Sequence, residues 1–294
     1  MTGTARQVHV RGAEALLAWA DAHLRDLPWR RTRDRWAVLV SEVMAQQTGV
    51  GRVVPYYERF LARFPDPGAC AAAPVGEVVR LWSGLGYNRR AVNLHRCARA
   101  VVHRHGGTVP GDLDDLRRLP GVGPYTARAV LAFACERDVG VVDTNIGRVL
   151  ARWAGRPLRP PEAQGVADAL VPPGRAWAWN QALMELGGTV CTRRRPRCAA
   201  CPVRDGCGWA AAGLAPPDPA DGSAGVGTGQ PRFEGSDRQG RGRLVEALCR
   251  GPVAVDRVAE VMGWPGDGGR ARRVLAGMMA DGIVTDDGDV VRLP

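Results

Sequence analysis

Two carboxylates, Glu42 and Asp143, lie in sequence contexts that favour acid–base chemistry. Glu42 is the one acid in a mostly apolar helical segment, residues 36–48, and burial there would raise its pKa and make it a usable acid at neutral pH. Asp143 precedes a predicted helix that starts at residue 144, where a capping carboxylate is expected to stay ionised. Such a pair suits cleavage of a glycosidic bond, because one group protonates the leaving group and the other faces the oxocarbenium ion.

A glycine turn lies upstream of Asp143. Residues 119–123 read Leu-Pro-Gly-Val-Gly and separate a predicted helix at 113–118 from another at 124–136. Gly121 and Gly123 let the backbone approach another surface closely, and the N–H groups at the start of the second helix form an anion site. The same residues also fit a plain interhelical turn, with Asp143 as an ordinary N-cap. The segment therefore predicts either a phosphate-binding hairpin or a simple connection.

Four cysteines in a short span predict one metal centre. They follow the spacing C-x6-C-x2-C-x5-C and are Cys191, Cys198, Cys201 and Cys207. Four-cysteine zinc sites usually pair two C-x2-C knuckles across a longer gap, whereas this loop has one. Cysteine thiolates are also the normal ligands of iron–sulfur clusters. The residue pattern leaves zinc and iron–sulfur open, with arginines at 193–195 and 197 forming a basic loop suited to phosphates.

The elements that must position these groups are almost all helical. Apolar periodicity predicts helices at 11–24, 36–48, 51–63, 75–83, 89–105, 113–118, 124–136, 144–153, 161–170 and 174–187. A β-prone run at 139–142 precedes Asp143. Residues 211–239 are rich in Pro, Gly, Ser and Asp and read as a linker. Residues 240–294 then read as helices at 242–250, 255–262 and 270–281 with a hairpin around Asp287-Gly288, a small winged-helix-like domain.

Charge points to a polyanionic partner. The 294-residue chain carries a formal net charge of +10, and all 40 of its basic residues are Arg. Nucleic acid is the default partner for such an excess. Since the chain has no Lys, no side-chain amine is available to form a Schiff base. We expect neither a signal peptide nor a membrane span.

Several ordered motifs resemble those of the A/G-mismatch adenine glycosylases (MutY type) in the helix-hairpin-helix DNA glycosylase superfamily. They are LPWR at 27–30, SEVMAQQTGV at 41–50, PYYERF at 55–60, LWSGLGYNRRAVNLH at 81–95, LPGVGPYTARAV at 119–130, VVDTNIGRVLAR at 141–152, NQALMELGGTVCT at 180–192 and the cysteine loop. The resemblance covers residues 15–210. It implies an all-α fold in which residues 1–210 are the catalytic region, with a six-helix barrel at about 30–140 and an iron–sulfur domain formed by 141–210 and the N-terminal helix.

The resemblance also implies roles for residues. Glu42 would protonate the adenine and later activate water, and Asp143 would stabilise or trap the sugar cation, supported by Tyr125 and Asn145. Arg25, Trp29 and Glu185 would line the pocket of the flipped adenine. The opposite guanine or 8-oxoguanine and the DNA backbone would be contacted by Gln47, Thr48, Leu85, Tyr87, Gly121 and Gly123, with Gln47 and Tyr87 as wedges. The cysteine loop would hold a [4Fe–4S] cluster. We expect a monomer that acts on double-stranded DNA containing A:8-oxoguanine or A:G mispairs, in the cytoplasm at the nucleoid.

Tyr125 distinguishes the branches of this superfamily. Endonuclease III relatives have a sugar-attacking lysine at this position, so Tyr125 predicts a monofunctional glycosylase. One alternative is a mismatch thymine or uracil glycosylase of the same superfamily, against which Glu42 argues because a purine leaving group needs an acid. Another is a non-catalytic iron–sulfur DNA-binding protein, against which Glu42 and Asp143 together argue.

The chain departs from the family pattern at three places. Ala45 replaces the usual Leu, Asn88 replaces the usual second Tyr, and nothing after Cys207 resembles the Nudix-like domain that senses 8-oxoguanine in this family. Residues 241–294 hold eight Arg and eight acids, so this part is neutral. Its apolar residues suffice for a compact core (Leu244, Leu248, Val258, Val261, Val274, Leu275 and Met278). We therefore expect a packing or tethering role without an extra site.

Overall fold

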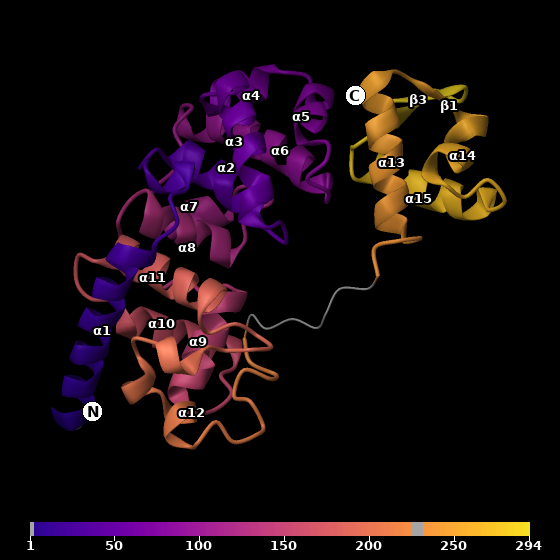
Figure 1. The fold of residues 1–294 in the computed structure, drawn as a ribbon. Coiled ribbons are helices and arrows are strands. Elements are labelled where there is room, and N and C mark those ends of the chain that lie inside the picture. Colours follow the sequence, from indigo (N-terminus) through magenta and orange to yellow (C-terminus); the bar gives the residue numbers. More distant parts are fainter. Residues whose placement is uncertain (1–2, 225–231) are drawn as a thin grey trace. The chain divides into compact units, whose positions relative to one another are not determined.

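The computed structural model describes residues 3–224 and 232–294, with side chains from residue 12 onward. It divides into two compact units, each described here by itself (Figure 1). The first unit comprises Met1–Arg33 and Pro124–Gly229, and the second comprises Asp34–Gly123 and Gln230–Pro294. The expected barrel at 30–140 is therefore divided after Gly123, because the helix that begins at Pro124 groups with the first unit. No described helix has the length and apolar character needed to cross a membrane.

The first unit is helical throughout its described residues. Its helices are α1 (Gly3–His23), η1 (Pro28–Arg30), α8 (Pro124–Phe133), α9 (Thr144–Ala154), α10 (Pro160–Leu170), α11 (Ala176–Thr189), η2 (Cys198–Ala200), η3 (Arg204–Gly206) and α12 (Gly208–Ala211). Helix α11 packs against α1, α8 and α9. The β-prone run at 139–142 forms no strand. Side chains hold it instead, because Asn180 accepts a hydrogen bond from Val141 N at 2.9 Å and Asp168 accepts one from Gly140 N at 2.8 Å.

The second unit begins with six helices. They are α2 (Arg35–Ala45), α3 (Val50–Arg63), α4 (Pro67–Ala72), α5 (Val75–Trp82), α6 (Arg89–His105) and α7 (Leu113–Arg117). Their core includes Phe60 and Trp82, both fully buried and in edge-to-face contact at 6.2 Å between ring centroids. The sequence analysis missed α4, whose six residues are too few to show a helical period; Asp66 caps it by accepting a hydrogen bond from Ala69 N.

The C-terminal domain has the helices and hairpin expected of a winged-helix-like fold. It consists of α13 (Asp237–Arg250), β1 (Val253–Ala254), η4 (Val255–Arg257), α14 (Val258–Met262), α15 (Gly268–Ala280), β2 (Thr285–Asp286) and β3 (Val290–Arg292). The three strands form an antiparallel sheet in the order β1-β3-β2, with Val253 opposite Val291 and Asp286 opposite Val291. The predicted core residues are buried apart from Val261, whose place is taken by Met262.

The expected linker at 211–239 is shorter than its composition suggests. Asp218 forms an ion pair with the buried Arg152 on α9 at 2.5 Å, and Ala224 N donates a hydrogen bond to Leu158 O at 2.8 Å. Helix α13 begins at Asp237, where Ser236 caps it. Residues 225–231 lie outside the described residues. Proline and glycine therefore mark a non-helical segment here, but residues up to 224 pack on the first unit.

Candidate active site and nucleic-acid interface

In the first unit, Asp143 is held at the N-terminus of α9 as the sequence predicts. Its Oδ1 accepts hydrogen bonds from the backbone N–H groups of Asn145 at 2.9 Å and Ile146 at 2.7 Å, and its Oδ2 accepts one from Asn145 Nδ2 at 2.9 Å. Burial raises the pKa of the Asp143 carboxyl, while these hydrogen bonds and the nearby Arg148 charge lower it. Burial is the largest of these effects, so the pKa lies above the ordinary value, contrary to the simple expectation for a capping carboxylate.

Arg148, which sequence reasoning missed, fixes the orientation of Asn145. Its Nη2 donates to Asn145 Oδ1 at 2.9 Å and to Gly187 O at 2.6 Å, and its Nε donates to Cys191 O at 2.7 Å. The residue is only 6% exposed. A continuous set of hydrogen bonds therefore runs from the first cysteine of the metal loop through Arg148 and Asn145 to the Asp143 carboxylate.

The residues expected to line the adenine pocket include an ion-pair cluster around one buried carboxylate. Glu185 on α11 is fully buried and pairs with Arg25 Nε at 2.6 Å and with Arg30 Nη2 at 2.9 Å. Arg30 also donates to Gln181 Oε1 at 2.8 Å. Trp29, between the two arginines in sequence, is 9% exposed. The structure thus joins Arg25 to Glu185 and adds Arg30, which the sequence analysis had not singled out.

In the second unit, Glu42 lies in the apolar face of α2. It is 8% exposed, and its helix neighbours Leu39 and Val43 are also buried. Helix α2 begins at Arg35 because Asp34 caps it, accepting a hydrogen bond from Ala37 N at 2.7 Å. The structure therefore confirms that Glu42 lies in an apolar, buried environment, and its catalytic role stays a prediction.

The two expected wedge residues share an unusual backbone conformation. Gln47 has φ of 55° and Tyr87 has φ of 50°, values in the left-handed region that L residues seldom adopt. Both side chains are exposed, Tyr87 by 38%. Each such residue costs on the order of 1 kcal/mol or more and persists only where surrounding contacts enforce it, which is common at ligand-binding positions. Leu85, in contrast, is 5% exposed and packs inward.

Arg90 enforces that conformation, and it too was missed by the sequence analysis. Its Nη1 donates to the carbonyls of Val43, Met44 and Gln46 at 2.8, 3.0 and 2.6 Å, and its Nη2 donates to Thr48 Oγ1 at 3.2 Å and Gly86 O at 3.1 Å. The guanidinium lies between the rings of Trp82 and Tyr87, at 5.3 and 5.5 Å from their centroids. Arg90 therefore ties the Gln46–Thr48 turn to the Gly86–Tyr87 turn.

In the glycine turn, Gly121 is exposed and Gly123 is partly buried. Gly121 has φ of 77°, and a Cβ there would lie 2.8 Å from Asn93 Cβ, so only glycine fits. Gly123 is open, with nothing within 4 Å of such a Cβ. Tyr125, the second residue of α8, is half-buried. The conformational requirement at Gly121 is thus shown, while phosphate binding by the turn stays a prediction.

The four cysteines of the metal loop line one pocket in the first unit, beside Arg152 and Trp209. Among the described residues no three His, Cys, Asp or Glu side chains converge closely enough to hold a single ion; the four thiols instead share the wall of this pocket, an arrangement that fits a cluster of several metal atoms. Burial raises the pKa of the Cys201 thiol to about 11, so thiolate ligands there need a compensating positive charge. Arg152 supplies part of it by donating to Cys191 Sγ at 3.3 Å.

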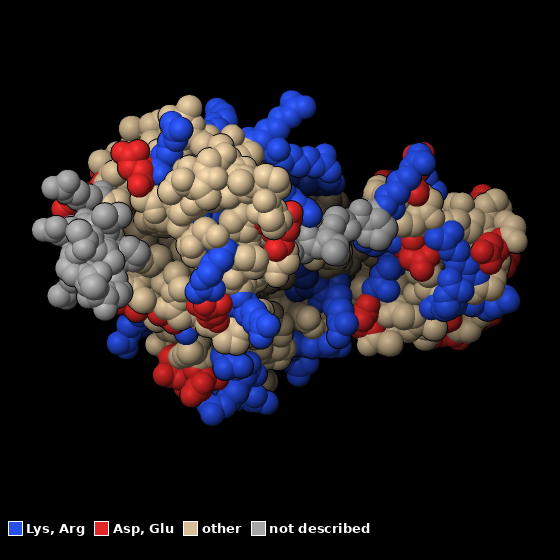
Figure 2. Space-filling model, turned by 90° about the horizontal axis from the view of Figure 1, so that it is seen from below, with Lys and Arg blue, Asp and Glu red and all other residues tan. Residues whose placement is uncertain are grey.

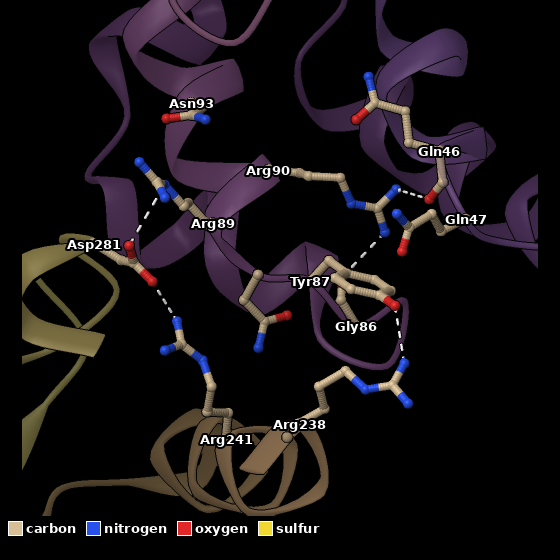
Figure 3. Close-up of a pocket in the computed structure, with 12 residues that line it drawn as sticks. Gln46, Gln47, Gly86, Tyr87, Arg89, Arg90, Asn93, Arg238, Arg241 and Asp281 are labelled. Atoms are coloured by element: carbon tan, nitrogen blue, oxygen red, sulfur yellow. Dashed lines mark hydrogen bonds and ion pairs between the residues drawn. The ribbon is translucent and has the colours of Figure 1, made fainter. Parts of the chain in front are cut away.

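The C-terminal domain contributes residues to a cavity beside Gln47 and Tyr87, and the expectation that it packs or tethers without an extra site stays a prediction. Blue and red side chains mix over this domain, at the right of Figure 2, as its equal numbers of arginines and acids lead one to expect. Arg238 Nη1 on α13 donates to Tyr87 Oη at 2.9 Å (Figure 3). Gly76 N on α5 donates to Pro294 O at 2.8 Å, and a Cβ on Gly76 would lie 2.3 Å from that oxygen.

Comparisons with known proteins agree with this arrangement. Residues 40–170 match the HhH-GPD superfamily of base excision DNA repair proteins, and residues 191–207 match the iron-sulfur binding domain of endonuclease III. The chain is 43% identical to adenine DNA glycosylase of Mycolicibacterium smegmatis, over 93% of this chain and 92% of that one. It is also 43% identical to adenine DNA glycosylase of Mycobacterium tuberculosis H37Rv, over 92% and 89%.

A solved structure of a thermostable thymine-DNA glycosylase is similar, with a TM-score of 0.67 and 29% identity over 70% of this chain and 98% of that one. The cysteine loop accordingly holds a [4Fe–4S] cluster, as its resemblance to the endonuclease III loop predicts. The chain belongs to the adenine DNA glycosylase family within the HhH-GPD superfamily of base excision DNA repair proteins.

Proposed function

We propose that this chain hydrolyses the N-glycosidic bond of adenine mispaired with 8-oxoguanine or guanine in double-stranded DNA, and that it does so as a monomer. The observation that carries the proposal is the setting of Asp143, whose carboxylate is fixed by three hydrogen bonds at the start of α9 and connected through Asn145 to the buried Arg148. A fixed negative group of this kind offsets positive charge that develops on the sugar as the base departs.

The other carboxylate supplies the proton. Glu42 is buried among apolar side chains, a setting in which a carboxylic acid can stay protonated and give its proton to the departing purine. The flipped adenine is received by Arg25, Trp29 and Glu185. The reacting sugar is supported by Tyr125 and Asn145. The opposite base is faced by Gln47, Thr48 and Tyr87, which Leu85 supports from the interior. A backbone phosphate is bound by Gly121 and Gly123.

We propose that the chain has no lysine-dependent lyase activity, because Tyr125 stands at the position of the attacking lysine and the sequence contains no Lys. Without a side-chain amine, no Schiff base forms with the abasic sugar. The product is then an abasic site in an intact strand. Efficient borohydride trapping of the enzyme on DNA would contradict this part of the proposal.

Single-turnover assays on duplexes that carry A:8-oxoguanine, A:G, A:T or T:G test the function. We expect adenine release from the first two, with strand cleavage only after alkali. Thymine release from T:G would favour the second candidate, a mismatch thymine glycosylase, which the similarity to a thymine-DNA glycosylase structure supports. Tight binding without base release would favour a non-catalytic role.

A further inference from the structure

The segment that follows the cysteine loop packs back onto the first unit. At its start, Trp209 Nε1 donates a hydrogen bond to Ala215 O at 2.9 Å. At its end, a Cβ on Gly147 of α9 would clash with Ala224 O, so the backbone of the segment touches the helix directly. Residues 215–224, which we call the strap, are therefore attached to the first unit at both ends.

Asp218 is the acid that the strap brings to α9. Its carboxylate accepts hydrogen bonds from Arg152 Nε at 3.0 Å and from Arg152 Nη2 at 2.5 Å, which is the bidentate geometry of a strong ion pair. Its Oδ1 also accepts one from Ala220 N at 2.9 Å, which fixes the carboxylate within the strap. The Arg152 side chain is 2% exposed and that of Asp218 is 22% exposed. Water and salt therefore screen the charges of this pair only weakly.

The same guanidinium also reaches the cysteine loop. Arg152 Nη1 donates to Cys191 Sγ at 3.3 Å and to Thr192 O at 2.8 Å. The guanidinium lies over the Trp209 ring, 4.8 Å from its centroid. None of these contacts involves the strap acid, so they hold the cation beside the first thiol independently of it. Arg152 therefore connects Asp218 to one ligand of the cluster.

The two charges of this pair act on a bound cluster in opposite directions. A [4Fe–4S] cluster supplies a one-electron redox centre, whose potential depends on nearby charge and on hydrogen bonds to its sulfur atoms. Because reduction adds negative charge, the Arg152 cation beside Cys191 favours the reduced form and raises the potential. The Asp218 anion offsets the same cation and therefore lowers the potential.

We propose that Asp218 belongs to the cluster site as its charge-balancing residue, and that together with Arg152 it sets the reduction potential of the bound cluster. The segment that matches the iron-sulfur binding domain of endonuclease III ends at residue 207, so Asp218 lies outside it. The strap is then part of the metal site rather than of a linker. This role depends on the cluster and not on which base the chain releases.

Voltammetry of the full chain with its cluster, on one electrode and at one pH, tests the proposal. Arg152→Gln removes the cation and should lower the midpoint potential. Asp218→Asn keeps the shape of the side chain and one acceptor oxygen but removes the charge, so the potential should rise. Asp218→Glu keeps the carboxylate and should stay close to the wild-type potential. The double variant Arg152→Gln/Asp218→Asn should lie between the two single variants, and a value outside that interval would contradict charge balance.

Arg156→Gln and Glu162→Gln are the matched control variants. Each removes one charge from an ion pair of the first unit whose side chains are 57% and 40% exposed, where water and salt screen it. Their potentials should stay within the scatter of wild-type preparations. Shifts in the Arg152 and Asp218 variants no larger than those of the controls would overturn the proposal. Shifts of the same sign in Arg152→Gln and Asp218→Asn would also overturn it.

The iron and sulfide content of each variant separates a change in potential from loss of the site. Asp218→Asn should retain the wild-type iron content, because Thr192 and Trp209 still hold Arg152. Loss of iron from Asp218→Asn would indicate a purely structural ion pair and refute the proposal. Where Arg152→Gln loses iron, the Asp218 variants decide alone, and a potential of Asp218→Asn at or below that of Asp218→Glu would refute it.

None of these readouts uses base release. A chain that shows the expected shifts in potential but releases no adenine would refute the proposed function and keep the role of Asp218. A chain that releases adenine but shows no shift would do the reverse.

Discussion

Two arginines, the buried Arg148 in the first unit and the partly buried Arg90 in the second, hold the expected site residues of their own units in different ways. Arg148 donates to a side chain, Asn145, that itself donates to Asp143. Arg90 donates to backbone carbonyls and Thr48, and packs between two aromatic rings. Burial lowers the pKa of both guanidinium groups, that of Arg90 to about 10. A pKa of about 10 still lies well above neutral pH, so the Arg90 guanidinium stays charged there.

This difference in partners predicts that Arg148 influences the chemical step, whereas Arg90 influences DNA binding. The Arg148 contacts end on the Asp143 carboxylate, so a change there alters the charge and orientation of the group that we propose faces the sugar cation. The Arg90 contacts end on two turns with left-handed residues, Gln47 and Tyr87, so a change there alters the shape of a binding surface. Variants of the first kind should slow base release, and variants of the second kind should weaken DNA binding.

The largest effect is expected at the carboxylates themselves. Asp143→Asn removes the charge that offsets the oxocarbenium ion, and Glu42→Gln removes the acid, so each should slow single-turnover adenine release by at least about 1,000-fold. Affinity for the mismatched duplex should stay within about threefold of wild type, since neither is a phosphate ligand. A variant that keeps near wild-type rates would contradict the role assigned to that residue.

A smaller effect is expected at Asn145, and it should depend on pH. Burial raises the pKa of Asp143, and the hydrogen bond from Asn145 lowers it, so Asn145→Ala should raise that pKa further. In the proposed mechanism the ionised carboxylate is the active form. The rate of adenine release by the variant should therefore be lowest relative to wild type at low pH and approach the wild-type rate as the pH rises. The pH profile of single-turnover release should show its acid limb displaced to higher pH. An equal loss of rate at all pH values would indicate that only the orientation of the Asp143 carboxylate had changed, and would contradict the expected pKa shift.

Arg90→Lys is expected to act on binding rather than on chemistry. A lysine ammonium has three donors and no planar fork, so it cannot keep the bonds to both turns or the stacking between Trp82 and Tyr87. Affinity for the A:8-oxoguanine duplex should fall by about tenfold, near 1.4 kcal/mol, while the rate at saturating enzyme changes by less than about threefold. Arg250→Lys, an exposed arginine of α13, serves as the control. A fall in the saturated rate as large as the fall in affinity would contradict this division.

Local patterns predicted most of the fold and the candidate residues, because they act over short spans of sequence. Helical periodicity located the long helices, the cap at Asp143 fixed the start of α9, and an Asp-Gly turn located the hairpin. Arg30, Arg90 and Arg148 were missed because 40 identical arginines give no sign of which few are buried. Their partners are backbone carbonyls and side chains distant in sequence, which no spacing records. The packing of Asp218 and Ala224 on the first unit was missed for the same reason.

The smallest effect should concern discrimination between opposite bases. Replacing Arg238 and Arg241 by Ala together should change affinity for A:8-oxoguanine and A:G duplexes to a similar extent, because neither arginine is among the residues proposed to face the opposite base. The ratio of excision rates on the two substrates should then change by less than about tenfold, under ~1.4 kcal/mol. Gly76→Ala offers a second approach, since its Cβ would clash with Pro294 O and disturb the C-terminal domain without removing an arginine. It should leave the ratio within the same limit. If either variant collapses the ratio while the iron content and the rate on A:G stay near wild type, the small C-terminal domain itself distinguishes 8-oxoguanine from guanine.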